Sequence, residues 1–599
     1  MINDNTILEV KDLSIAFNGR MVVDNISYTL ERGKTLGIVG ESGSGKSVSS
    51  LALMGLLPKQ ATVTGQAFLS QSEQKENAVE TSDSSFSSDC NKTINLIELS
   101  EEQMRGIRGK RISMIFQEPM TSLNPVQKCG AQVMEMMREH GVKRSEKGVI
   151  GSDRTIARER VVDLFREVLL PRPEKIFDSY PHEISGGQKQ RVMIAMALIN
   201  HPDIIIADEP TTALDVTVQK TILELLKSLQ EKHGISIIFI THDLGVISQI
   251  ADDILVMYRG KVIEQGPAYD ILHHPQQPYS QGLLACRPPL DSKPRRLPTV
   301  EDYLKGVKGS EKTNAPAKVL SPHSPSLPLT SSHSPLISVR DLSVTYTLKR
   351  SLFGKPLQTL KGVDGISFDI REGETLGLVG ESGCGKSTLG RALLRLIDHS
   401  AGNILYRGRS LDTLSAKEIR ALRPKLQIIF QDPYSSLNPR KTIGEAIAEP
   451  LKVHRSILNT QSNPITPRDT VIALMEQVGL QADWYNRYPH EFSGGQRQRV
   501  CIARALILQP ELVVCDESVS ALDVSVQAQV LNLLNDLKER YHYTYLFITH
   551  DLSVVKFLSD RIMVMQKGKI VESGTPDDIF HHPQTDYTRT LIDALPRID

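Results

Sequence analysis

Short runs of apolar residues alternate with longer segments of mixed polarity along the whole chain. Residues 204–207, 235–240 and 512–515 are predominantly apolar, which is typical of parallel strands buried on both faces. Residues 7–17 and 337–346 alternate apolar and polar positions, which predicts strands with one buried face. Because mixed helical segments separate the apolar runs, we expect an α/β fold with parallel sheets flanked by helices.

One sequence pattern occurs twice. Four pairs of identical residues, each pair of a different residue type, are separated by 308 positions: Ser185 and Ser493, Asp208 and Asp516, His242 and His550, Tyr279 and Tyr587. Chance matches would drift in register, so the constant spacing indicates one duplicated domain.

The two copies are separated by a segment of different composition. Nine prolines and many serines lie between Pro288 and Pro335, a composition that favours extended conformations over a packed core. We therefore predict a first domain at residues 1–285, a linker at 286–335 and a second domain at 336–599. The first copy also carries an insertion at about residues 70–92, rich in Ser, Glu and Gln, which we expect to be a disordered surface loop.

Composition narrows the class of protein. The chain has 599 residues, 40% of them apolar and 23% charged, as expected for a soluble globular protein of two or more domains. Its net charge is zero, so we expect no general attraction to nucleic acid. Six scattered cysteines without a CxxC pair argue against a zinc or disulfide framework. No apolar run approaches the roughly 18 residues that a membrane span requires.

Two glycine-rich segments, residues 40–47 and 380–387, have the spacing that binds a polyphosphate through backbone N–H groups. We expect Lys46 and Lys386 to contact the β and γ phosphates, and Ser47 and Ser387 to bind Mg²⁺. The remaining predicted ATP-binding residues of these loops are Gly40, Ser42, Gly43, Gly45, Gly380, Ser382, Gly383 and Gly385. Cys384 lies inside the second loop, where we interpret it as a small tolerated residue rather than a redox switch.

Two apolar strands end abruptly in an Asp-Glu pair. Burying such a pair is costly, which indicates a functional role. We expect Asp208 and Asp516 to hold Mg²⁺ through water, and Glu209 and Glu517 to take the proton from the attacking water. The alternative is that the acids only cap the helices that follow.

Ile-Ser-Gly-Gly-Gln at 184–188 and Phe-Ser-Gly-Gly-Gln at 492–496 resemble the signature of ATP-binding-cassette (ABC) proteins. The resemblance implies two tandem P-loop NTPase domains, each with a RecA-like parallel-sheet core, an antiparallel β subdomain and a helical subdomain. It also implies further site residues: Ser185, Gly187, Ser493 and Gly495 at ATP, Phe17 and Tyr346 stacked on adenine, Gln117 and Gln431 at Mg²⁺ and water, and His242 and His550 at the γ phosphate. The aromatic residues could instead fill a core, and the histidines could be structural.

Paired cassettes of this family close head to tail around two ATP molecules. The resemblance therefore implies two composite sites within the one chain, one of Lys46, Glu209 and His242 with Ser493 and Gly495, the other of Lys386, Glu517 and His550 with Ser185 and Gly187. Both sets are complete, so we expect two hydrolytic sites.

Residues 118–125 and 432–439, the Tyr-Pro-His-Glu segments at 180–183 and 488–491, and the His-His-Pro tails are similar to ATPase subunits of dipeptide, oligopeptide and nickel importers. This resemblance implies two transmembrane permease subunits, an extracytoplasmic solute-binding protein and a peripheral location on the cytoplasmic face of the inner membrane. Peptides are the leading solute class. Some relatives carry several cysteines after the first cassette, but this chain has only Cys286, so we expect neither an iron–sulfur cluster nor zinc. The alternatives are a soluble tandem-cassette ATPase acting on ribosomes or nucleic acid, and an exporter ATPase.

Overall fold

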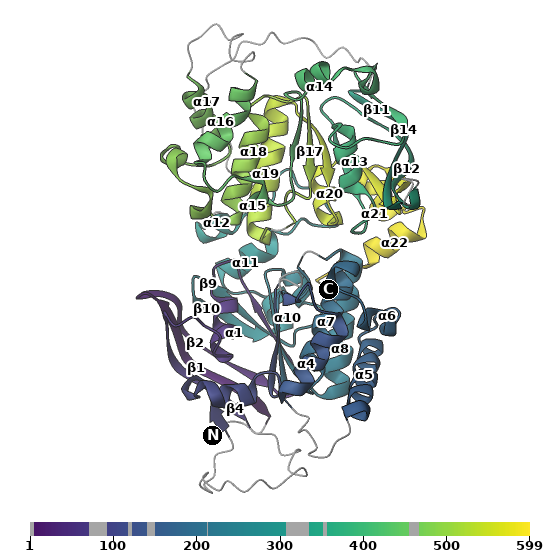
Figure 1. Ribbon diagram of the computed structural model, residues 1–599. Helices are drawn as coiled ribbons and strands as arrows, with labels where there is room; N and C mark the ends of the chain where they lie inside the picture. Colours follow the sequence, from purple (N-terminus) through teal and green to yellow (C-terminus); the bar gives the residue numbers. More distant parts are fainter. Residues whose placement is uncertain are drawn as a thin grey trace, which may run out of the picture. The chain divides into compact units, whose positions relative to one another are not determined.

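The computed structural model of the chain describes residues 5–70, 93–117, 122–140, 150–212, 214–306, 335–350, 356–454, 466–520 and 522–598 (Figure 1). The predicted insertion, apart from residue 70, and residues 307–334 of the predicted linker lie outside this described part. The chain divides into two compact units. The first comprises Met1–Leu214, Val218–Leu284 and Pro596–Asp599, and the second Asp215–Thr217 and Ala285–Leu595.

A six-stranded sheet in the order β10-β9-β3-β8-β7-β6 forms the centre of the first unit. Its strands are β3 (Thr35–Val39), β6 (Ile112–Ile115), β7 (Ile204–Asp208), β8 (Ser236–Thr241), β9 (Asp253–Tyr258) and β10 (Lys261–Pro267). All neighbours pair in parallel except β9 and β10. Every residue of β3, β7 and β8 is buried, which explains their nearly continuous apolar sequences.

A four-stranded sheet, β2-β1-β4-β5, forms the second layer. It is antiparallel and consists of β1 (Thr6–Phe17), β2 (Arg20–Glu31), β4 (Ala61–Ser70) and β5 (Thr93–Asn95). One apolar cluster contains residues of this sheet, residues of the six-stranded sheet and Ala52, Leu53 and Met54 at the end of helix α1 (Lys46–Leu53). Helix α1 is therefore packed into the core that both sheets share.

The remaining helices cover the six-stranded sheet or form a separate helical part. They are α2 (Glu101–Ile107), α4 (Cys129–His140), α5 (Ile150–Glu167), α6 (Pro173–Phe177), α7 (Gly186–Leu198), α8 (Val216–His233), α9 (Leu244–Ile247), α10 (Ala268–His273) and α11 (Pro278–Ala285), with 3₁₀ turns η2 (Leu96–Glu98) and η3 (Pro181–Glu183). Helices α4, α5, α6 and α7 pack on one another and lie on the side of this unit away from β1, β2 and β4 (Figure 1).

The second unit repeats this arrangement. Its sheets have the orders β12-β11-β14-β15 and β16-β17-β18-β13-β19-β20. The strands are β11 (Ile337–Arg350), β12 (Pro356–Ile370), β13 (Thr375–Val379), β14 (Ala401–Tyr406), β15 (Arg409–Ser410), β16 (Leu426–Ile429), β17 (Leu512–Asp516), β18 (Thr544–Ile548), β19 (Arg561–Gln566) and β20 (Lys569–Gly574). The matching order of strands confirms the domain duplication that the 308-residue spacing predicted.

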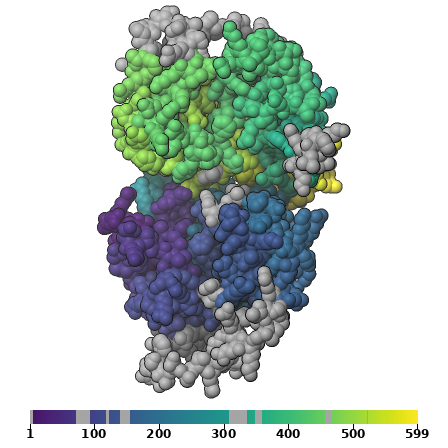
Figure 2. Space-filling model, in the orientation of Figure 1, coloured from purple at the N-terminus to yellow at the C-terminus, as the bar shows by residue number. Residues whose placement is uncertain are grey.

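The helices of the second unit follow the same plan. They are α12 (Val300–Leu304), α13 (Lys386–Leu393), α14 (Ala416–Leu422), α15 (Pro433–Ser436), α16 (Ile443–Val453), α17 (Pro467–Gln477), α18 (Gly494–Leu506), α19 (Val524–Tyr541), α20 (Leu552–Leu558), α21 (Pro576–His581) and α22 (Asp586–Asp593), with 3₁₀ turns η4 (Leu411–Thr413), η6 (Ala482–Asn486) and η7 (Pro489–Glu491). In the space-filling view, light-green and blue-green atoms lie on opposite sides of the yellow core atoms of this unit (Figure 2). They belong to its helical and antiparallel-strand parts.

The expected α/β class with a parallel core, an antiparallel sheet and a helical part is confirmed in both units. In the part of the chain that the structure describes, every helix is too short or too polar to cross a membrane.

The first part of the predicted linker is packed, although its composition favours extended conformations. Leu297 is 1% exposed and Val300 is 4% exposed, and both belong to the second unit. Proline-rich chain can pack in this way because its backbone polar groups find partners on the surface that it covers. The domain boundaries given above stay a prediction.

Candidate nucleotide site

The first phosphate loop connects β3 to α1 and uses backbone conformations that suit glycine. Gly40, Gly43 and Gly45 have φ of +152°, +80° and +100°. A Cβ atom on Gly40 would lie 2.2 Å from the carbonyl oxygen of Met257, so a side chain cannot be accommodated there. The helix begins after Gly45 without a side-chain cap. Its first N–H groups and the positive end of its dipole are therefore arranged for an anion.

Lys46 lies across this loop. Its Nζ donates hydrogen bonds to the carbonyl oxygens of Gly40 at 2.7 Å and Glu41 at 2.9 Å. The ammonium group is thus held over the loop where the phosphates of a nucleotide would lie.

Ser47, in the first turn of α1, and Asp208, at the end of β7, meet at the carboxyl edge of the parallel sheet. The Ser47 Oγ donates to Asp208 Oδ1 at 2.9 Å. Burial raises the pKa of Asp208 to about 6, although the hydrogen bond from Ser47 opposes that rise. A hydroxyl and a carboxylate are the oxygen ligands that Mg²⁺ prefers, and they fit the predicted metal position.

The carboxylate of Glu209 contacts three side chains. Its carboxylate accepts from Gln117 Nε2 at 2.8 Å and Thr212 Oγ1 at 2.9 Å, and lies 3.3 Å from His242 Nδ1. Burial by itself would raise the pKa of Glu209, but His242, Thr212 and Lys46 together lower it to about 2. The group is therefore an ionised acceptor, as a general base must be.

The backbone also directs Glu209. Its φ is +47°, a left-handed conformation that non-glycine residues rarely adopt, and its N–H donates to the carbonyl oxygen of Ile240 at 2.9 Å. Glu517 has φ +48° and the same bond to Ile548. Strained backbone of this kind clusters at functional sites, which argues against a simple helix-capping role.

The second unit builds the same cluster. Lys386 Nζ donates to the carbonyl oxygens of Gly380 and Glu381 at 2.7 and 2.9 Å. Ser387 Oγ donates to Asp516 Oδ1 at 2.7 Å, and Gln431 Nε2 donates to Glu517 Oε2 at 2.7 Å. Burial raises the pKa of Asp516. The pKa of Glu517 is lowered because His550 and Lys386 outweigh the opposing effect of its burial.

The two clusters differ in detail. Arg391 lies 3.9 Å from Asp516, whereas leucine occupies the matching position 51. Thr212 donates to the carboxylate of Glu209, but its counterpart Ser520 donates to the backbone carbonyl of Glu517. His550 Nδ1 is 3.8 Å from its glutamate, farther than in the first unit. The second carboxylate is therefore held by fewer close donors.

Ser185 and Ser493 begin helices α7 and α18. Each accepts from the N–H of the glutamine three residues later and completes a capping box with it. A Cβ on Gly187 would lie 2.7 Å from Val218, and one on Gly495 would lie 2.1 Å from Val526. Both glycines thus allow close packing, and both helices present N-terminal N–H groups at partly exposed turns.

The two predicted adenine-stacking residues differ in exposure. Phe17 is partly buried against the core of the first unit. Tyr346 is 41% exposed, and its hydroxyl is 3.4 Å from Thr388 Oγ1 in the helix that follows the phosphate loop. Tyr346 is therefore available for stacking beside the loop, whereas Phe17 also fills a core. Stacking on adenine stays a prediction for both.

Sequence reasoning missed one support of each loop. The backbone N–H of Glu41 donates to the hydroxyl of Tyr279 at 3.1 Å, and that of Glu381 donates to Tyr587 at 3.0 Å. Both tyrosines were visible as repeated residues at the 308-residue spacing, but nothing in their local sequence connects them to a phosphate loop.

Cys384 is buried, and its burial raises the pKa of the thiol. A thiol of raised pKa reacts slowly because the thiolate is scarce. This supports its interpretation as a small residue of the loop.

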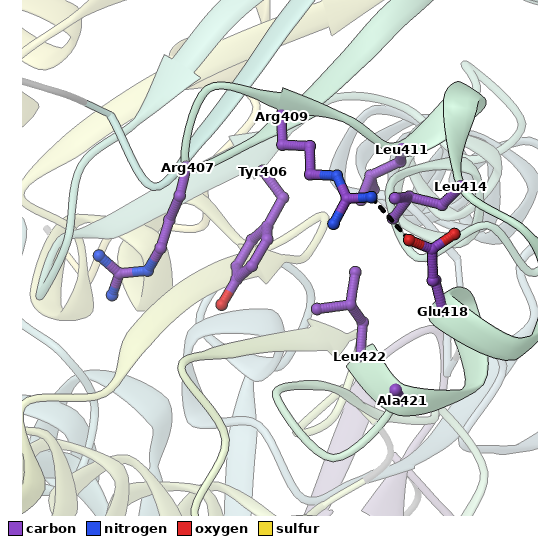
Figure 3. A pocket seen from close by; sticks show the side chains of 8 residues that line it. All are labelled: Tyr406, Arg407, Arg409, Leu411, Leu414, Glu418, Ala421 and Leu422. Atoms are coloured by element: carbon purple, nitrogen blue, oxygen red, sulfur yellow. Dashed lines mark hydrogen bonds and ion pairs between the residues drawn. The ribbon is translucent and has the colours of Figure 1, made fainter.

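A pocket of about 400 Å³ in the second unit lies apart from these motifs, between β14, β15, η4 and α14 (Figure 3). Arg409 donates to Glu418 at 2.6 Å in its wall, and Arg407 pairs with Glu372 and Glu511. Its charged groups are thus already compensated. Among the described residues, no three His, Cys, Asp or Glu side chains converge as metal ligands.

Two family models match the chain. The ABC transporter model matches residues 23–212 and 363–520. The model described as "Oligopeptide/dipeptide transporter, C-terminal region" matches residues 263–310 and 571–599. Apart from His242 and His550, the residues of both nucleotide clusters lie within the ranges of the first model, and Tyr279 and Tyr587 lie within those of the second.

Whole-length relatives are also found. The chain is 44% identical to the glutathione import ATP-binding protein GsiA of Shigella sonnei over 605 residues, which cover 99% of this chain and 90% of that one. It is 45% identical to GsiA of Salmonella typhimurium over 611 residues, covering 100% and 91%. Among solved structures, cbiO1 from Clostridium perfringens matches with 25% identity and a TM-score of 0.35, over 42% of this chain and 92% of that one.

Proposed function

Because the chain belongs to the ABC transporter ATP-binding family, we propose that it is the ATPase subunit of an importer for glutathione or related small peptides. The observation that carries this proposal is the identity of 44–45% over nearly the whole length to glutathione import ATP-binding proteins. The match of both tails to the oligopeptide and dipeptide transporter region supports the same solute class.

ATP hydrolysis follows from the clusters described above. Lys46 and Lys386 would bind the β and γ phosphates, and Ser47 with Asp208 and Ser387 with Asp516 would hold Mg²⁺. When bound, Mg²⁺ neutralises charge on the phosphates. Glu209 and Glu517 would accept the proton of the attacking water, because each carboxylate is ionised and lies beside the Ser–Asp pair that would hold Mg²⁺.

Gln117 and Gln431 would orient that water. Each donates its amide to the carboxylate of the base, at 2.8 and 2.7 Å. His242 Nδ1 and His550 Nδ1 lie 3.3 and 3.8 Å from the carboxylates of the same glutamates, and both histidines would contact the γ phosphate.

We further propose that each cassette completes the other's site, with Ser493 and Gly495 serving the first nucleotide and Ser185 and Gly187 the second. The capped helices α7 and α18 support this, since their N-terminal N–H groups suit a phosphate. The partners would be two transmembrane permeases and an extracytoplasmic binding protein at the cytoplasmic face of the inner membrane. We expect neither an iron–sulfur cluster nor zinc.

Reconstitution tests the proposal. The chain is combined with two candidate permeases and a binding protein in proteoliposomes, and ATP-dependent uptake of labelled glutathione and of a dipeptide is measured. Uptake that needs every component and is lost with Glu209→Gln and Glu517→Gln is expected. Efflux instead of uptake would indicate the exporter alternative. Absence of membrane association together with salt-sensitive RNA or DNA binding would indicate the nucleic-acid alternative.

A further inference from the structure

Residues 288–304, called the strap below, follow the last helix of the first domain but pack within the second unit. The strap covers helices α19 and α20. It lies outside both nucleotide clusters, so ATP chemistry does not account for its contacts.

One buried side chain pairs with the middle of the strap. Asn532, on α19, accepts from the backbone N–H of Leu297 at 2.8 Å and donates its amide to the Leu297 carbonyl at 2.8 Å. Asn532 is 2% exposed and Leu297 is 1% exposed. This pair of hydrogen bonds binds the backbone of the strap as a neighbouring strand would. The apolar side chain of Leu297 is buried beside it.

The first half of the strap is held at α20. Lys556, which is 2% exposed, donates to the carbonyl oxygen of Leu290. Lys293 of the strap donates in return to the carbonyl oxygen of Ser559 at 2.6 Å. A buried charged donor such as Lys556 requires an acceptor, so its contact adds to the specificity of the fit, whereas Lys293 is exposed.

The second half of the strap lies at α19 and near α18, the helix that begins after Ser493. Arg295 and Arg296 pair with Glu539 and Asp536 at 2.9 and 3.4 Å, exposed contacts that contribute little energy but match in charge. Helix α12 then buries Val300. Burial lowers the pKa of Arg499 on α18, and Glu301 of α12 partly offsets this. The strap thus contacts or faces three helices of the second unit.

The first unit lacks the counterpart of Asn532. At the 308-residue spacing, Asn532 corresponds to Glu224, which is exposed on α8. Lys556 corresponds to Ser248, whose hydroxyl donates to the backbone carbonyl oxygen of Arg597 at 3.2 Å. The paired hydrogen bonds to Leu297 therefore have no equivalent at the corresponding position of α8.

We propose that the α19–α20 face of the second cassette is a docking site for the strap, the C-terminal segment of the first cassette. Through this contact the two cassettes stay attached even when the chain between them is cut within residues 307–334. The inference goes beyond the importer function and holds whichever solute is carried.

The test uses the full-length chain with a specific protease sequence inserted between Pro322 and His323. The folded protein is cleaved without nucleotide, which removes the contribution of bound ATP to association. It is then immobilised through an N-terminal tag, and the C-terminal fragment retained after washing is measured over time. We expect the wild-type fragments to stay together.

Two variants alter opposite sides of the contact. Leu297→Asp places a charge in the apolar position of the strap, and Asn532→Ala leaves the Leu297 backbone groups without their partners. Each should speed release of the fragment by about tenfold or more. Glu224→Ala is the matched control at the corresponding position of the first unit and should behave as wild type.

Thermal unfolding of each variant accompanies the release measurement. Should Asn532→Ala disturb the second unit itself, Leu297→Asp decides the outcome, since it alters the strap alone. Separation of the wild-type fragments as fast as those of Leu297→Asp would overturn the proposal. Retention of the Leu297→Asp fragments as firm as in wild type would also overturn it, because another surface would then hold the cassettes.

Discussion

The hydroxyl of Tyr279 accepts a hydrogen bond from the backbone N–H of Glu41, 3.1 Å away, and so fixes the first phosphate loop from the C-terminal region of its domain. Tyr279 is 1% exposed and its ring lies 4.3 Å from that of Tyr258. The loop that would bind ATP is therefore positioned by a tyrosine 238 positions away in the chain.

Replacing Tyr279 by Phe should weaken ATP binding at the first site about fivefold. The change removes one net hydrogen bond, worth about 1 kcal/mol, from a loop whose conformation the nucleotide requires. Equilibrium binding of a fluorescent ATP analogue measures it, in a background where Lys386→Ala disables the second site. Tyr258→Phe removes a hydroxyl from the adjacent ring and serves as control. Equal affinities for the two variants would contradict the role of Tyr279.

Glu209→Gln and Glu517→Gln together should reduce ATP turnover by about two to four orders of magnitude while ATP still binds. Glutamine keeps the size of the side chain but cannot accept the proton of water. Phosphate release and nucleotide binding are measured in parallel. Glu224→Gln makes the same chemical change outside the site and should be neutral. Turnover near the wild-type rate would show that these glutamates only shape the backbone.

The raised pKa of Asp208 predicts that stability depends on pH. Because the folded pKa of about 6 exceeds the ordinary value of 3.8, the folded state binds more protons between these values. Stability from this group is therefore greatest at low pH and is lost as pH rises toward 6, by up to about 3 kcal/mol. Denaturant unfolding without Mg²⁺ between pH 4.5 and 7.5 should show this decline.

The Asp208→Asn variant provides the comparison for that experiment, because its side chain does not titrate. Its unfolding free energy should fall less steeply over the same interval. Mg²⁺ binding, which needs the ionised carboxylate, should strengthen in the wild type as pH rises through 6. Parallel pH profiles for the two proteins would rule out Asp208 as the titrating group.

Gly495→Ala should destabilise the second unit by about 1–3 kcal/mol, since the new Cβ would lie 2.1 Å from Val526 Cγ1. Gly494→Ala is the matched control, because its nearest neighbour, Leu522 Cδ2, is 4.0 Å away. Adding Val526→Ala to Gly495→Ala should restore part of the loss by making space. Chemical denaturation measures all three, and equal stability of the two single variants would refute the packing argument.

Much of the nucleotide cluster could be predicted because its members occupy local, recognisable positions. Lys46 and Ser47 are neighbours in one loop, and Asp208 and Glu209 end a buried strand, so parallel pairing brings them together. The relationship of Tyr279 to Glu41 could not be predicted, because it depends on how distant elements pack.

Two other features were also hidden. No sequence motif places Arg391 beside Asp516, 3.9 Å away. No motif marks Asn532 either, and the proline content around Leu297 indicated a linker. The pairing of Asn532 with Leu297 depends on tertiary packing, and no periodicity or motif in the sequence predicts it.

The left-handed backbone of Glu209 and Glu517 has a consequence for how these positions can evolve. With φ near +47°, the main chain itself excludes valine, isoleucine and threonine, whatever chemistry they could offer. Substitutions at either position should therefore favour asparagine, aspartate or glycine. A homologue that has lost one hydrolytic site would be expected to carry one of these three residues there.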